Sequence, residues 1–180
     1  MSLYIALVLM TVAIAVALVW SRVRAHRISK CTWDQLVARI QPVGSEGVTV
    51  VALDHLAPAK NQLRIEPEEM WNLLGGLEGL KRMQENATVL IALAAYAERW
   101  NYCESVIVAE RMRRDALAVR RAVRAIRRSS HLRPWLTIAN VRLPFLLHDA
   151  AGSYYLMRQR LLALYETSHA GRYPRLAAVV

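Results

Sequence analysis

The sequence predicts an all-α protein with a single N-terminal transmembrane helix followed by a compact bundle of about five to seven helices. Three observations predict this fold class. Residues 3–20 form one uncharged apolar run, and most later segments repeat apolar residues at the helical period. The 180 residues also include only seven Gly and six Pro beside abundant Ala, Leu and Arg, a composition that favours helices over a turn-rich β fold.

The apolar run reads LYIALVLMTVAIAVALVW and is long enough to cross a bilayer. As a helix it would span about 27 Å, close to the thickness of a hydrocarbon core. Tyr4 and Trp20 stand near its two ends, where interfacial aromatic residues are common. No basic side chain precedes the run, whereas a cleaved signal peptide begins with a basic region, so we expect an uncleaved anchor.

Basic residues follow this anchor directly, among them Arg22, Arg24 and Arg27. By the positive-inside rule such a flank stays in the cytoplasm, so we expect an inner-membrane protein of a bacterium with its N-terminus outside. Tyr4, Trp20 and these three arginines are the predicted membrane-interface residues. The predicted organisation is a transmembrane anchor at residues 1–21, a basic juxtamembrane segment at 22–31 and a cytoplasmic helical domain at 32–180.

Local signals mark the first helices of this domain. The run Thr32-Trp33-Asp34-Gln35 matches a capping box, which predicts a helix start, and Pro42 ends that helix. Residues 45–57 fit either a helix or a short β-branched strand. We favour the helix because a lone strand would find no other strand here to pair with. Pro67 is typical of the first turn of a further helix.

The middle of the chain contains a glycine run and a candidate capping residue. Gly75, Gly76 and Gly79 interrupt an apolar stripe, which predicts a kink or a close helix–helix contact. The run lacks the GK[ST] ending of a phosphate-binding loop. We expect Asn86 to cap the next helix and Pro144 to start or kink the last one.

Residues 102–129 form the longest periodic segment and sit in the most basic part of the chain. The whole chain has a net charge of +10, and residues 102–133 alone hold nine arginines against three acidic residues. The apolar residues of this segment recur at steps of three and four, which predicts a seam that packs on other helices. They are Val108, Met112, Ala116, Val119, Val123 and Ile126.

The arginines of the same segment gather on one flank of the predicted helix. On a projection of 100° per residue from Met112, the seam falls within about 40° of zero and these arginines between about 60° and 180°. We call them the arginine strip: Arg113, Arg120, Arg121, Arg124, Arg127 and Arg128. The strip is either a polyanion-binding surface or an ordinary solvated helix face, and the sequence leaves that choice open.

A search for catalytic chemistry gives no predicted catalytic, cofactor-binding or metal-binding residue and no predicted cofactor. The five histidines are far apart, and the HExxH and GxSxG motifs are absent. His148 and Asp149 form the one adjacent acid–base pair, but neighbouring helical residues point about 100° apart. Cys31 and Cys103 are too few for a disulfide framework.

These observations favour a membrane-anchored interaction or scaffold protein with an unidentified protein partner. An alternative is binding of anionic lipid, or less readily of nucleic acid, through the basic helix at residues 102–129. Lipid ranks above nucleic acid because an anchored domain already lies beside a membrane. A second alternative is an enzyme without a recognisable motif.

Overall fold

The computed structural model of the chain describes Met10, Val12 and residues 31–56, 65–97, 102–132, 143–168 and 171–180. Within these ranges the chain forms seven α-helices and no strand. They are α2 (Trp33–Val37), α3 (Ser45–Leu56), α4 (Pro67–Leu73), α5 (Gly76–Ala97), α6 (Tyr102–Leu132), α7 (Leu143–Ser168) and α8 (Tyr173–Ala177). The prediction of an all-α helical bundle is therefore confirmed for the described part of the chain.

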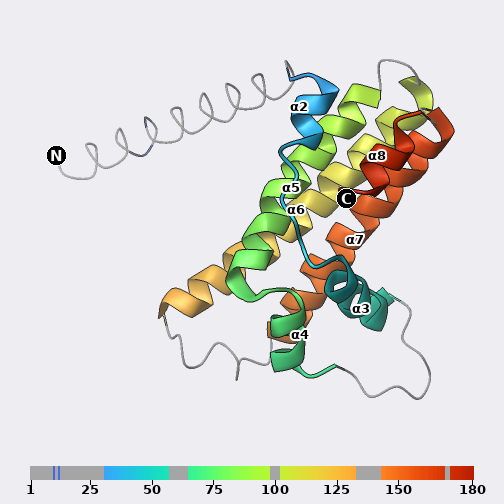
Figure 1. Cartoon of the computed structure of the whole chain (residues 1–180). Helices are drawn as coiled ribbons and strands as arrows, with labels where there is room; N and C mark the ends of the chain where they lie inside the picture. The colour runs from blue at the N-terminus through green and yellow to red at the C-terminus, as the bar shows by residue number, and fades with distance from the viewer. Residues whose placement is uncertain are drawn as a thin grey trace.

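Three long helices, α5, α6 and α7, form the body of the bundle (Figure 1). Each of the three contacts the other two. The short helices α2 and α8 lie toward one end, where α2 packs on α5 and α8 on α7. Helices α3 and α4 lie at the other end and pack mainly on α7 and on each other. One face of α6 is therefore covered by its two long neighbours, and the opposite face is left to solvent.

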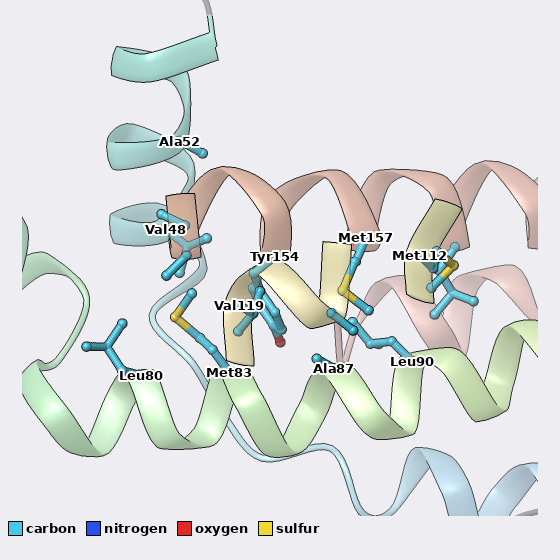
Figure 2. Close-up of a cluster of buried hydrophobic side chains, with 14 of the residues drawn as sticks. Val48, Ala52, Leu80, Met83, Ala87, Leu90, Met112, Val119, Tyr154 and Met157 are labelled. Carbon is cyan, nitrogen blue, oxygen red and sulfur yellow. The ribbon is translucent and has the colours of Figure 1, made fainter. Parts of the chain in front are cut away.

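The core is built from apolar side chains that the three long helices direct toward one another. Figure 2 shows Met83 and Leu90 of α5, Met112 of α6 and Met157 of α7 in one cluster, and all four are fully buried. The predicted seam of residues 102–129 is confirmed, because five of its members are buried and Val108 is half-buried. The five are Met112, Ala116, Val119, Val123 and Ile126.

The predicted start of the first helix and the helical reading of residues 45–57 are both confirmed. The Thr32 hydroxyl accepts a hydrogen bond from the Gln35 backbone N–H at 3.4 Å, and the Gln35 side chain accepts one from the Thr32 N–H at 3.1 Å. In α3 the β-branched residues Val48 and Val51 are fully buried. These valines share one face of a helix and pack against the rest of the bundle, so burial overrides their preference for strands.

The glycine run produces a full break between two helices. Helix α4 ends at Leu73 and α5 begins at Gly76. Gly75 and Gly76 have φ angles of +73° and +62°, in the left-handed region that favours glycine. Where the sequence predicts a kink or a close helix–helix contact, the structure therefore has a turn between two separate helices.

The prediction that Asn86 caps a helix is wrong. Helix α5 runs without interruption from Gly76 to Ala97, so Asn86 lies near its middle and is almost fully buried. Its side-chain oxygen accepts from the Gln41 N–H at 2.9 Å, and its amide nitrogen donates to the Gln41 carbonyl at 2.8 Å and to the Tyr154 hydroxyl at 3.1 Å. Asn86 therefore satisfies the backbone of the segment between α2 and α3 and links it to α7.

A cluster of aromatic and cationic side chains joins the helices at the α2 end. The Trp33 and Tyr165 rings lie 6.4 Å apart, and the Arg172 guanidinium lies 5.3 Å from the centre of the Trp33 ring. The Tyr165 hydroxyl donates to the Leu93 carbonyl at 3.0 Å, and burial raises the pKa of Tyr165 to about 12. These contacts bind α2, α5, α7 and the C-terminal segment together at the end where residue 31 enters the domain.

Several predictions fall on residues outside the described ranges. They include almost the whole of the anchor at 3–20 and the interface residues Tyr4, Trp20, Arg22, Arg24 and Arg27. Among the residues that are described, no helix is both long and apolar enough to cross a membrane.

Candidate functional site

The arginine strip runs along the flank of α6 next to α5. Arg113, Arg121, Arg124, Arg127 and Arg128 are exposed, and Arg120 is half-buried. Because the buried seam fixes how α6 rotates against α5 and α7, the arginines on the neighbouring flank have to face solvent. From Arg113 to Arg128 the strip is about 22 Å long. The structure therefore places all six predicted arginines along one flank of α6.

Arg120 connects the strip to the neighbouring helix. Its guanidinium donates to the Thr88 hydroxyl of α5 at 2.8 Å, in a partly buried position. The Arg124 guanidinium in turn donates to the Arg120 carbonyl at 3.2 Å. Arg120 is thus held by the fold, and the exposed arginines beside it supply the charge that an external partner can reach.

Glu110 offsets charge at the beginning of the strip. It pairs with Arg113 at 3.3 Å and with Arg114 at 3.8 Å, all of them well exposed, so these ion pairs are weak. Among the described residues Arg121, Arg124 and Arg128 form no ion pair. These three exposed arginines therefore carry charge that no carboxylate of the described residues pairs with.

Leu117 lies within the strip and was not among the predicted site residues. It is 44% exposed, although leucine is usually buried. On the projection used above it falls at about 140°, between the arginines and away from the seam. Arg113 and Arg121 flank it at a distance of four residues each, so they share its side of the helix. The same projection would have identified Leu117 from the sequence.

The opposite flank of α6 carries the exposed Arg111 and an ion pair with α7. Asp115 forms a partly buried ion pair with Arg160 of α7. Burial and the nearby charge of Arg111 lower the pKa of the Arg160 guanidinium. This pair fastens α6 to α7, so the two flanks of α6 differ in role: one makes a bundle contact and the other presents charge.

The structure pairs His148 with Asp54 of α3 and not with its sequence neighbour Asp149. The His148 Nε2 lies 2.9 Å from the Asp54 carboxylate, both side chains are nearly buried, and Asp149 is exposed. The His55 ring stacks on the His148 ring with centres 5.3 Å apart. The described residues contain no group of three or more His, Cys, Asp or Glu able to hold a metal ion. This cluster fastens α3 to α7.

Two hollows on the described surface lie beside helix α4. One of about 510 Å³ lies beside Glu66, Glu68 and Glu69 at the start of α4, and it is lined by no histidine or cysteine. A smaller one of about 230 Å³ lies beneath Pro42 and beside Arg82. The Arg82 guanidinium already donates to the Pro42 carbonyl at 3.4 Å, so its charge is not directed at an open site.

No family model matches the chain, and comparison with curated proteins and with solved structures also finds no match.

Proposed function

We propose that this chain is a membrane-anchored helical interaction protein and that the arginine strip is the surface through which it binds a polyanionic partner. In this proposal the run at residues 3–20 is the anchor and the bundle lies in the cytoplasm. The observation that supports the binding surface is the exposure of five strip arginines along one flank of a single rigid helix.

Arginine is well suited to such a surface. Its planar guanidinium stays charged and can donate two parallel hydrogen bonds to a phosphate or carboxylate group. The backbone positions of the strip are fixed by the packing of α6 on α5 and α7, so binding has to order only side chains. The attraction is mainly electrostatic, which makes it sensitive to salt.

Reversing the charge of two strip residues should weaken polyanion binding at least tenfold. The variant carries Arg121→Glu and Arg128→Glu, both exposed in the wild type and without an ion pair among the described residues. Each basic residue near an anionic surface contributes about 1 kcal/mol, and reversal adds repulsion to that loss. The measurement is fluorescence anisotropy of a labelled polyphosphate chain with the full-length protein in nonionic detergent, at low and high salt.

The control reverses two exposed arginines elsewhere, Arg39→Glu beside α2 and Arg175→Glu in α8, of which Arg175 pairs with the exposed Asp34 at 3.0 Å. It changes the net charge by the same amount and should alter binding by less than about twofold, because electrostatic attraction falls off within a Debye length of about 8–10 Å. Equal loss in both variants, at unchanged thermal stability, would mean that net charge and not the strip attracts the polyanion.

A further inference from the structure

Resting on the function proposed above, we infer that the polyanion is the anionic leaflet of the same membrane that holds the anchor. The bundle then lies on its side against the lipid headgroups, with α6 parallel to the bilayer and the arginine strip facing it. Three properties favour a lipid surface over a soluble polyanion, two of the described residues and one of the sequence.

The first property is the shape of the strip. Its five exposed arginines extend over about 22 Å along one side of α6, within an arc of about 120°. A planar layer of headgroups can contact several of them at once, whereas Arg120 stays half-buried against Thr88. Proteins that bind single-stranded nucleic acid combine a groove with aromatic side chains on which bases stack. Residues 106–128 of α6, which include the whole strip, contain no aromatic residue.

The second property is the exposed leucine among the arginines. Leu117 is 44% exposed and lies among the arginines. An apolar side chain has no charge or hydrogen-bond donor for a soluble anion. At a membrane surface the same leucine can enter the boundary between headgroups and acyl chains while the arginines bind phosphate. Helices that lie in a membrane interface combine Lys or Arg, which face the headgroups, with Leu, Phe or Trp, which enter the acyl boundary. The apolar seam of α6 is buried in the bundle, so on the strip's flank Leu117 is the side chain that can do this.

The third property is the length of the tether. Ten residues separate Trp20, at the end of the predicted anchor, from Cys31, where the described domain begins. Such a segment reaches at most about 35 Å when extended. Two layers of helices are about 20–24 Å thick. The bundle can therefore lie on the membrane that anchors it, and the tether raises the effective concentration of that surface.

The test reconstitutes the full chain in nanodiscs of neutral phosphatidylcholine or of phosphatidylcholine with phosphatidylglycerol. Phenylglyoxal modifies accessible arginines, and mass spectrometry gives the rate at each position. We expect Arg121, Arg124 and Arg128 to react at least fivefold more slowly in the anionic nanodiscs than in the neutral ones. High salt should abolish this protection. Arg39, which is exposed beside α2, serves as the internal control in the same sample and should react equally in both lipids.

A second variant and a soluble competitor separate this inference from the proposed function. Leu117→Gln should lose at least half of the protection given by the anionic leaflet and none of the protection that polyphosphate gives in neutral nanodiscs. Protection of the strip by polyphosphate but not by the anionic leaflet would overturn the lipid inference and leave the proposed function intact. Protection by neither would overturn both.

Discussion

Replacing Asn86 with Ala should lower the free energy of unfolding by about 3 kcal/mol. The substitution removes the two hydrogen bonds to the Gln41 backbone and the one to the Tyr154 hydroxyl. Asn86 itself is 1% exposed, so water reaches its partners poorly and they are left unsatisfied. The measurement is chemical denaturation of the full chain in nonionic detergent, followed by circular dichroism.

Gln84→Ala is the matched control for this prediction. Gln84 lies two residues earlier in α5, is half-buried and carries the same amide group without a hydrogen bond to another described residue. Its loss should change the unfolding free energy by less than about 0.5 kcal/mol. An effect of Asn86→Ala as small as this would show that the segment between α2 and α3 is not held by Asn86.

Replacing Gly47 with Ala should destabilise the protein by about 2 kcal/mol, although alanine is the better helix former. A Cβ at this position would lie 2.2 Å from the Leu73 carbonyl oxygen and 2.9 Å from its carbon. Both are backbone atoms at the end of α4, so they cannot move aside by a side-chain rotation. We expect α3 and α4 to separate, which a fall in the midpoint of thermal unfolding would report.

Gly44→Ala is the control, because its Cβ would meet the same Leu73 oxygen at 3.7 Å, an ordinary contact. It should change stability by less than about 0.5 kcal/mol. Equal midpoints for the two alanine variants would contradict the close packing of α3 on the end of α4.

The sequence predicted best where the information is local or periodic. The capping box at Thr32 needs only four neighbouring residues, and the seam through Met112 and Val123 fixes the rotation of α6 by its spacing alone. Because the seam determines which flank is exposed, the position of the arginine strip followed from the same projection. The same projection also places Leu117 among these arginines, but the sequence prediction considered only the arginines of that flank.

The sequence could not predict contacts between residues distant in the chain. Asn86 resembles a capping residue locally, and only the approach of Gln41, 45 positions away, explains its place inside a helix. His148 likewise has an acidic neighbour in sequence, yet its partner Asp54 is 94 positions away. Gln41 and Asp54 reach these residues because the chain around α2 packs on α5 and because α3 packs on α7. The periodicity of a sequence does not predict such contacts between helices.

Fluorescence quenching by a lipid-attached quencher shows directly whether the arginine strip faces an anionic membrane. An environment-sensitive probe is placed on Glu110→Cys or on Leu53→Cys, after both native cysteines are replaced by Ser. Glu110 is exposed at about 160° on the projection of α6, so a probe there lies on the flank of the strip and leaves all six arginines in place. Leu53 is 42% exposed on α3, which packs on α7 and α4. In anionic vesicles we expect strong quenching at 110 that high salt removes, and weak quenching at 53. Equal quenching at the two positions, or stronger quenching at 53, would mean that the strip does not face the membrane.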